Sequence, residues 1–313
     1  MKDIKNVLIC GLGAIGSIYA NILQEQVNLK ILVDEKRFER YRNNPLIFNG
    51  KELHFDYILP SYPNFKADLI IIATKYDGLL DAIKNIENFI CNDTIVMSLL
   101  NGVTSEEFIA QKYGYDKILY SYFIGHSSVR NGRSITHDGT NTIVFGSPNP
   151  NKNLIRVKEF FDKTSIHYEI PEDIIYSIWL KYMLNVSCNQ ISAIKKYTFG
   201  DILNNKKCME LVINVMKEVQ TLAKAEGVKN TENMLNDASK ALNTMNPDGK
   251  TSMLQDILAG RKTEVEIFAG TVVELGKKHK IPTPLNDYLK IYIELLEWKK
   301  PIPYNVSKVF DLI

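Results

Sequence analysis

Cysteine is scarce in this 313-residue chain, and the positions of its few cysteines exclude two classes of site. The four cysteines, Cys10, Cys91, Cys188 and Cys208, are scattered and never form a C-x-x-C pair. This spacing predicts neither a disulfide framework nor a zinc site, and we expect no bound metal. Most of them lie in apolar stretches, where cysteine packs as a small hydrophobic residue, and this fits a reducing compartment.

An excess of charge of either sign is also missing. The 38 basic and 36 acidic residues leave a formal net charge of +2, which gives no reason to expect nucleic acid or an anionic membrane as a partner. No apolar run reaches the length of a transmembrane helix. The run that begins at Val7 stops at a glycine turn with no cleavage-like segment behind it. We therefore expect a soluble, cytoplasmic protein.

The first half of the chain alternates short apolar runs with amphipathic segments. We expect strands at 7–10, 29–33, 69–73, 94–99, 118–122 and 142–145, and helices at 14–24 and 78–88. Uniformly apolar strands that alternate with helices are typical of a parallel sheet covered on both faces. Asn49-Gly50 is a turn signal for a small hairpin or edge strands over 50–59.

The second half has almost no strand signals. Helical periodicity runs through five segments, at 177–194, 208–226, 231–242, 262–280 and 284–297. The change of pattern comes near Pro171, so we place a domain boundary at about residue 172. The sequence therefore predicts an α/β domain over 1–172 and an all-helical domain over 173–313.

A glycine-rich turn follows the first predicted strand and opens the first predicted helix. The turn reads Gly11-Leu12-Gly13-Ala14-Ile15-Gly16. Gly11 permits the turn, Gly13 lets the backbone approach a pyrophosphate, and Gly16 lets the helix pack closely on the strand. The helix N-terminus supplies amide donors and a favourable dipole. A turn without a ligand is the alternative, but the strand–turn–helix context favours a Rossmann dinucleotide-binding domain.

The residues after the second predicted strand leave the choice of dinucleotide open. Asp34 stands where an acidic residue would bind the ribose 2′-hydroxyl of NAD, or it could be a turn residue or a helix cap. Lys36 and Arg37 follow at once and could hold the 2′-phosphate of NADP. Lys75, just past the 69–73 strand, would project from the same edge of the sheet and could serve that phosphate.

Polar side chains interrupt the otherwise apolar helix predicted at 177–194. Lys181, Asn185 and Asn189 recur at intervals of four residues and form one slowly drifting stripe. The stripe could face solvent or line a cleft, and the residues alone leave both interpretations open. On a cleft wall, a lysine can act as a general acid toward a carbonyl oxygen or hold a carboxylate.

Three further polar positions each have an ordinary structural explanation. Ser252 and Gln255 fit a capping box at the start of a helix, and Glu264 would pass as an exposed helix residue. Asn101 fits an Asn-Gly turn. It also follows the 94–99 strand at the carboxyl edge of the sheet, where ligands bind in open α/β folds.

In combination, these positions resemble the ketopantoate reductase family, the 2-dehydropantoate 2-reductases. The features that carry the resemblance span both halves in order: Gly11–Gly16, Lys75, Asn101-Gly102, the K-x-x-x-N-x-x-x-N helix from Lys181, and Ser252-Met253-Leu254-Gln255-Asp256 followed by Glu264. The helix motif and the S-M-L-Q-D segment are specific, whereas the glycine turn is not. The resemblance implies NADPH-dependent reduction of 2-dehydropantoate to pantoate, a step toward pantothenate and coenzyme A.

The resemblance also implies roles for individual residues. Lys181 would be the general acid that protonates the forming alkoxide, and Glu264 would bind the terminal hydroxyl of the substrate. The other polar residues would bind ligands: Ser252 the substrate carboxylate, Asn185 and Asn189 the substrate as a whole, and Asn101 both cofactor and substrate. Hydride addition to a ketone builds negative charge on oxygen, and an ammonium group there both stabilises the charge and donates the proton.

One position departs from the family pattern. Where members commonly have an arginine after the second strand, this chain has Asp34-Glu35 before Lys36-Arg37, so we expect NADPH while NAD stays possible. The alternatives are a reductase of another small 2-oxo or 3-hydroxy acid on the same architecture, and a non-catalytic NAD(P)-sensing protein. The expected substrate is a small-molecule 2-oxo acid, and the expected assembly is a homodimer through the helical domain.

Overall fold

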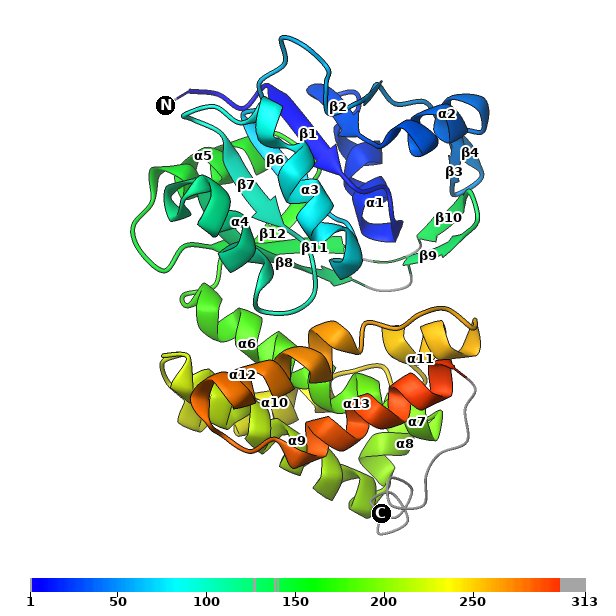
Figure 1. The fold of residues 1–313 in the computed structure, drawn as a ribbon, viewed down its shortest axis with the longest axis vertical. Helices are drawn as coiled ribbons and strands as arrows, with labels where there is room; N and C mark the ends of the chain where they lie inside the picture. The colour runs from blue at the N-terminus through cyan, green and yellow to red at the C-terminus, as the bar shows by residue number, and fades with distance from the viewer. Residues whose placement is uncertain (1, 126–127, 138, 140, 299–313) are drawn as a thin grey trace. The chain divides into compact units, whose positions relative to one another are not determined.

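The computed structural model describes residues 2–125, 128–137, 139 and 141–298. The chain divides into two compact units, Met1–Ile174 and Ile175–Ile313. The first unit combines sheets with helices, and the described part of the second is helical (Figure 1). Among the described residues, no helix is both long enough and apolar enough to cross a membrane.

An eight-stranded sheet forms the centre of the first unit, with the strand order β12-β11-β8-β7-β6-β1-β2-β5. Neighbouring strands run parallel except β11 and β8, which pair antiparallel. The strands are β1 (Asn6–Cys10), β2 (Asn28–Leu32), β5 (Tyr57–Ile58), β6 (Leu69–Ile72), β7 (Ile95–Ser98), β8 (Ile118–Gly125), β11 (Asn141–Gly146) and β12 (His167–Glu169). The predicted α/β fold, with a Rossmann-like parallel sheet followed by a helical region, is confirmed.

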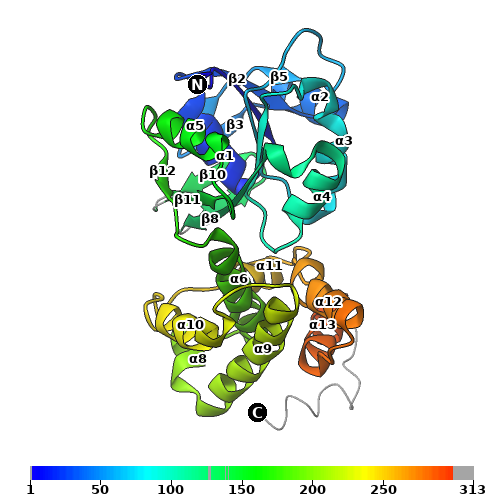
Figure 2. The same ribbon diagram turned by 90° about the vertical axis from the view of Figure 1, so that its left-hand side faces the viewer.

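Both faces of this sheet are buried, as the uniformly apolar strands require. In β1, Val7 and Ile9 belong to one hydrophobic cluster and Leu8 and Cys10 to another, because successive side chains point to opposite faces. The first cluster includes residues of α1 (Ala14–Leu23) and α5 (Lys152–Phe161), and the second includes residues of α3 (Leu79–Asn85) and α4 (Ser105–Tyr113). Figure 2 shows these two helix pairs on opposite sides of the sheet.

The remaining short elements of the first unit connect these layers. They are α2 (Glu35–Asn43) and three 3₁₀ turns, η1 (Tyr76–Gly78), η2 (Glu87–Phe89) and η3 (Tyr115–Lys117). Because β1, β6 and β7 are parallel neighbours, their carboxyl ends share one edge of the sheet. This is the edge at which open α/β folds bind ligands.

A second sheet, with the order β4-β3-β10-β9, contacts α1. It joins two hairpins from distant parts of the chain: β3 (Leu46–Phe48) with β4 (Lys51–Leu53), and β9 (Ser128–Asn131) with β10 (Ser134–His137). The predicted Asn49-Gly50 turn is confirmed, with φ values of 47° and 83° that suit a two-residue hairpin loop. The hairpin also uses Leu46–Phe48, which the prediction omitted.

The second unit is helical throughout its described residues. Its elements are α6 (Ile174–Leu184), η4 (Asn185–Asn189), α7 (Gln190–Lys195), α8 (Phe199–Asn204), α9 (Lys206–Ala225), η5 (Thr231–Asn233), α10 (Met234–Asn243), α11 (Ser252–Leu258), η6 (Glu266–Gly270), α12 (Thr271–His279) and α13 (Pro284–Glu297). The long helix α9 contacts α8, α10, α12 and α13. It buries one apolar face that includes Val212, Val215 and Val219, whose spacing of three and four residues is helical.

Two of the predicted helices are not continuous α-helices. The segment predicted at 177–194 contains a π-turn, η4, between α6 and α7. The helix predicted at 262–280 begins only at Glu266, again with a π-turn, η6, before α12. A π-turn widens the helix by one residue, and such turns occur frequently at functional sites. The polar stripe of the sequence therefore lies on a helix with a local change of register.

Candidate active site

The glycine turn lies where β1 ends and α1 begins. Gly11 has a φ of 101°, and a Cβ there would lie 2.7 Å from the carbonyl oxygen of Ala73. A Cβ at Gly16 would lie 1.9 Å from the carbonyl oxygen of Gly11. Both glycines are therefore required by the protein itself, for the turn and for the close approach of α1 to the sheet.

Gly13 is not required in the same way. Its φ of −71° and ψ of −165° are accessible to any residue, and the nearest atom to a Cβ there would be the carbonyl oxygen of Ala73, 3.9 Å away. Gly13 is the N-cap of α1, and no side chain of the described residues caps that helix. An open space beside uncapped helical N–H groups fits the pyrophosphate of a dinucleotide.

Asp34 caps α2. Its Oδ1 accepts a hydrogen bond of 2.6 Å from the backbone N–H of Arg37, and its Oδ2 pairs with the guanidinium of Arg37. The helix-cap interpretation is thus confirmed, and the carboxylate also neutralises the nearest cation. Lys36, between them, is exposed. To bind a 2′-phosphate, Arg37 must turn away from Asp34, which costs at most about 1 kcal/mol for an exposed pair.

Lys75 and Asn101 follow neighbouring strands at the carboxyl edge of the sheet. Ile72, the last residue of β6, pairs in register with Ser98, the last residue of β7. Lys75 is exposed and follows shortly after the end of β6. Asn101 is half-buried and follows shortly after the end of β7. The structure therefore brings both residues to the edge that carries the glycine turn.

A chain of buried hydrogen bonds anchors the loop that carries Asn101. Ser98 donates to the hydroxyl of Ser105 at 2.9 Å, and Ser105 donates to the carboxyl group of Glu106 at 2.8 Å. Burial raises the pKa of Glu106 to about 7. Nothing in the sequence marks Glu106 as buried, because an acidic residue in the first turn of a helix is ordinary.

In the second unit, Lys181 lies on α6, and Asn185 and Asn189 lie on the π-turn η4. Lys181 and Asn185 are half-buried, and Asn189 is 6% exposed. The stripe is therefore not a solvent-facing surface. Burial lowers the pKa of Lys181 to about 8, against the opposing effect of the negative charge of Glu264.

Buried polar side chains hold the π-turn in place. Gln190 donates from Nε2 to the carbonyl oxygen of Val186 at 2.7 Å and to Oδ1 of Asn286 at 3.2 Å. Asn286 in turn donates to the carboxylate of Glu218 at 2.8 Å. The side chain of Gln190 thus bonds a carbonyl group of the π-turn, and side chains from α9 and α13 hold Gln190 in place.

Ser252 is brought to the asparagines of the stripe. Nδ2 of Asn189 lies 3.5 Å from the hydroxyl of Ser252 and 3.5 Å from Oδ1 of Asn185. The predicted capping box is wrong: Thr251 is the N-cap of α11, and its hydroxyl accepts from the backbone N–H of Leu254 at 3.2 Å. The hydroxyl of Ser252 is consequently not used as the helix cap, and Ser252 is exposed.

Glu264 precedes the π-turn η6 and is not on a helix, which corrects the prediction of an exposed helix residue. Its neighbour Thr263 is fixed by a 2.7 Å bond from its backbone N–H to the carboxylate of Glu297. On the other side, the hydroxyl of Tyr182 donates to the carbonyl oxygen of Phe268 at 2.8 Å, tying η6 to α6. Glu264 is therefore held near enough to Lys181 to act on its charge.

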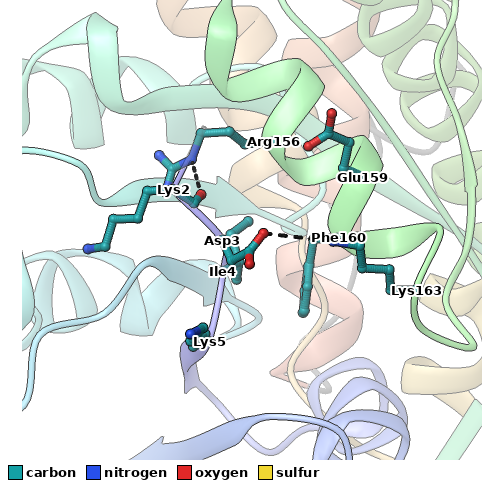
Figure 3. Close-up of a pocket in the computed structure, with 8 residues that line it drawn as sticks. All are labelled: Lys2, Asp3, Ile4, Lys5, Arg156, Glu159, Phe160 and Lys163. Carbon is teal, nitrogen blue, oxygen red and sulfur yellow. Dashed lines mark hydrogen bonds and ion pairs between the residues drawn. The ribbon is translucent and has the colours of Figure 1, made fainter.

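Figure 3 shows the residues that line a hollow elsewhere in the first unit. Its volume is about 160 Å³. It is lined by Lys2–Lys5, Arg156, Glu159, Phe160 and Lys163. Lys2–Lys5 precede β1, so this hollow is at the amino end of the strand, opposite the glycine turn. Arg156 is fixed there by bonds to the backbone carbonyl groups of Lys2 and Asp93. The described residues contain no cluster of His, Cys, Asp and Glu that could hold a metal ion.

Relatives of known name match both units. The family profile described as ketopantoate reductase PanE/ApbA matches residues 7–150, and its C-terminal counterpart matches residues 173–296. The 2-dehydropantoate 2-reductase of Pyrococcus horikoshii is 27% identical over 296 residues, which cover 93% of this chain and 97% of that protein. The match thus extends over nearly the whole of both chains.

Solved structures share the fold. A ternary structure of D-mandelate dehydrogenase with NADH and anilino(oxo)acetate has a TM-score of 0.80 at 21% identity and covers 94% of this chain and 99% of that one. A dimeric ketopantoate reductase from Staphylococcus aureus has a TM-score of 0.77 at 19% identity, with 95% and 100% covered. Since the two family profiles match the α/β unit and the helical unit in order, the chain belongs to the ketopantoate reductase family of oxidoreductases.

Proposed function

We propose that this protein reduces 2-dehydropantoate to pantoate with NADPH, a step toward pantothenate and coenzyme A. The observation that carries the proposal is the polar group of the second unit, in which Glu264 acts on the charge of Lys181. Asn189, on the π-turn, contacts Ser252. A hydroxylated 2-oxo acid calls for such a set: a proton donor, an acceptor for its hydroxyl, and neutral donors for its carboxylate. The name of the Pyrococcus horikoshii relative adds support.

The chemistry divides between cofactor and protein. A bound nicotinamide supplies a hydride to the carbonyl carbon of the substrate. As the new C–H bond forms, the electron pair of the C=O π bond moves to oxygen. The ammonium group of Lys181 donates a proton to that oxygen, which yields the 2-hydroxy acid, and the neutral amine then regains a proton from solvent. A pKa of about 8 suits this exchange near neutral pH.

The other polar residues position the substrate. Glu264 accepts a hydrogen bond from the terminal hydroxyl, and Ser252 donates one to the carboxylate. Asn185 and Asn189 orient the molecule so that its carbonyl oxygen meets Lys181. Correct placement of reacting groups contributes much of the rate enhancement in such reactions.

In the first unit, Gly11–Gly16 hold the pyrophosphate on the N-terminus of α1. Lys36, Arg37 and Lys75 bind the 2′-phosphate of NADPH, and Asn101 contacts both cofactor and substrate. The alternative dinucleotide is NADH, with Asp34 on the ribose 2′-hydroxyl. The pairing of Asp34 with Arg37 keeps this alternative open, because either partner can be released to a ligand.

A second candidate is the reduction of another 2-oxo acid with NADH. It is favoured by the presence of Asp34 and by the fold shared with D-mandelate dehydrogenase, which was solved with NADH and anilino(oxo)acetate. For the assembly, we infer a homodimer, on the precedent of the dimeric Staphylococcus aureus enzyme. The absence of a disulfide among the four cysteines supports a reducing, cytoplasmic location.

Initial velocities with 2-dehydropantoate, measured with NADPH and NADH in parallel, test the function. Fast turnover with NADPH supports the main proposal. Preference for NADH would indicate that Asp34 binds the ribose 2′-hydroxyl. No turnover with either dinucleotide, combined with turnover of an aryl 2-oxo acid, would select the second candidate. Lys181→Ala serves as the inactive control.

A further inference from the structure

Arg130 is fixed beside the glycine turn although it lies more than a hundred residues from it in the sequence. It belongs to β9 of the small sheet, and both β9 and β10 contact α1. Its Nη1 donates to the carbonyl oxygen of Leu12, inside the turn. Its Nε donates to the carbonyl oxygen of Gly132 at 3.0 Å, which holds the side chain against its own hairpin.

The same guanidinium group reaches α2. Its Nη2 lies 3.3 Å from the hydroxyl of Tyr41, and the group lies 5.9 Å from the centre of the Tyr41 ring. Tyr41 is 4% exposed and belongs to the helix that Asp34 caps. Arg130 therefore contacts both the glycine turn, where we place the pyrophosphate, and α2, the helix that follows the proposed ribose contact Asp34.

Within the part of the chain that the structure describes, the hydrogen-bond partners of Arg130 are all neutral. They are two backbone carbonyl groups and one phenol. Among the described residues, Arg37 pairs with Asp34 and Arg133 with Glu52, whereas Arg40 shares the hydroxyl of Tyr41 with Arg130. No carboxylate among the described residues pairs with the half-buried guanidinium of Arg130, so no ion pair there offsets its positive charge. This charge lies beside the N-terminus of α1, where an anion is favoured.

We propose that Arg130 is a phosphate-binding residue of the dinucleotide site. This inference rests on the proposed function, since it requires a nicotinamide dinucleotide on Gly11–Gly16. A guanidinium presents a planar fork of N–H donors that matches the oxygens of a phosphate. Bonds to the described residues use three of the five N–H groups of this arginine, and the other two suit a ligand.

Two phosphates of the dinucleotide offer this chemistry: the pyrophosphate, common to NADH and NADPH, and the 2′-phosphate, present in NADPH alone. If Arg130 binds the 2′-phosphate, its positive charge would offset the negative charge of Asp34. It would also explain how a chain with an acidic residue after β2 accommodates a 2′-phosphate. The two sources differ in which dinucleotide is affected when Arg130 is lost.

The test measures dissociation constants for NADPH and NADH by nicotinamide fluorescence, without substrate, on the whole chain. Arg130→Met removes the charge and keeps an apolar stem. Arg133→Met is the matched control, because Arg133 lies on the same hairpin, is exposed, and pairs with Glu52 at 3.4 Å. We expect Arg130→Met to raise the dissociation constant by tenfold or more, and Arg133→Met to leave it unchanged.

The pattern of loss identifies the phosphate. Equal losses for both dinucleotides place Arg130 on the pyrophosphate, and a loss for NADPH alone places it on the 2′-phosphate. Unchanged affinities for both would overturn the inference while leaving the proposed function intact. If the wild-type chain binds neither dinucleotide, the proposed cofactor site itself is wrong.

Thermal unfolding without ligand separates binding from folding, because Arg130→Met also removes bonds to Leu12 and Gly132. If Arg130→Met does not fold, the dissociation constants of Arg130→Lys for the two dinucleotides test the proposal instead. It keeps the charge without the fork, and we expect a severalfold loss of affinity. Unchanged affinities in a folded Arg130→Lys protein would then contradict the proposal.

Discussion

The negative charge of Glu264 raises the pKa of Lys181 while burial lowers it, and burial is the larger of the two effects. The balance leaves the ammonium group with a pKa of about 8, well below that of an exposed lysine. Lys181 is thus protonated at neutral pH yet holds its proton weakly enough to give it away. The charge state of Lys181 therefore depends on pH close to neutrality.

The rate of ketone reduction should therefore fall as the pH rises through about 8. Reduction needs the protonated amine, and its fraction declines tenfold for each pH unit above the pKa. Glu264→Gln removes the charge that supports the ammonium, so we expect the descending limb of the pH–rate profile to move to lower pH. Lys181→Ala should lower turnover by on the order of a hundredfold or more. A limb that stays in place in Glu264→Gln would exclude Lys181 as its origin.

Gly13 and Gly16 should respond differently to the same substitution. Gly16→Ala would place a Cβ 1.9 Å from the carbonyl oxygen of Gly11, so we expect severe destabilisation. Gly13→Ala meets no protein atom closer than 3.9 Å and should change the free energy of unfolding by no more than about 1 kcal/mol. It should nevertheless weaken dinucleotide binding by tenfold or more, because its methyl group would occupy the proposed ligand's place. Urea unfolding and fluorescence titration measure the two effects, and undiminished binding in a folded Gly13→Ala protein would argue against a ligand there.

Removing the adjacent hydroxyl groups of Thr251 and Ser252 one at a time should affect different properties, stability in the first case and substrate binding in the second. Thr251 caps α11, so Thr251→Ala should cost about 1 kcal/mol of stability. Ser252 is exposed and does not cap the helix, so Ser252→Ala should leave the melting temperature nearly unchanged and raise KM for the 2-oxo acid. Each variant is the control of the other. Equal KM values for Ser252→Ala and the wild type would remove Ser252 from the site.

Glu106 should make stability depend on pH in the direction opposite to an ordinary surface carboxylate. Its pKa is raised to about 7, so between 4.5 and 7 the folded state keeps a proton that the unfolded state has lost. This contribution to stability is present at low pH and is lost as the pH rises through about 7, by up to about 3 kcal/mol. Glu106→Gln should flatten that dependence and stabilise the protein at pH 8.

Urea unfolding at pH 5, 6, 7 and 8 measures the effect. Glu107→Gln is the control, because Glu107 is the next residue on the same helix and is exposed. We expect it to follow the wild-type curve. Parallel curves for Glu106→Gln and the wild type would show that the buried carboxyl group does not change its protonation in this range.

Local patterns predicted the elements whose signals are contained within a few residues. Pro284 at the first helical position and the periodicity after it gave α13 its observed bounds. The glycine turn was equally local, because strand, turn and helix are adjacent in the sequence. In these cases the residues that carry the signal are also those that make the contacts.

Where neighbours compete or partners are remote, the same patterns were insufficient. The capping box assigned to Ser252 failed because Thr251, one residue earlier, has an equally suitable hydroxyl and takes the position. The π-turn at 185–189 was not visible, since a spacing of four residues suits both kinds of helix. Arg130 reaches Leu12 only because β10 pairs with β3, a contact between segments far apart in the chain.

The π-turn also makes this region sensitive to the length of the chain and not merely to the identity of its residues. Deleting one residue from Asn185–Asn189 would allow a regular α-helix to form, with better backbone pairing than the wide turn has. The helix beyond the deletion would keep nearly its orientation, because the wide turn had accommodated that extra residue, whereas the side chains within the turn would shift to α-helical positions. Such a protein could keep both Asn185 and Asn189 and still lose the spacing at which the wide turn holds their side chains.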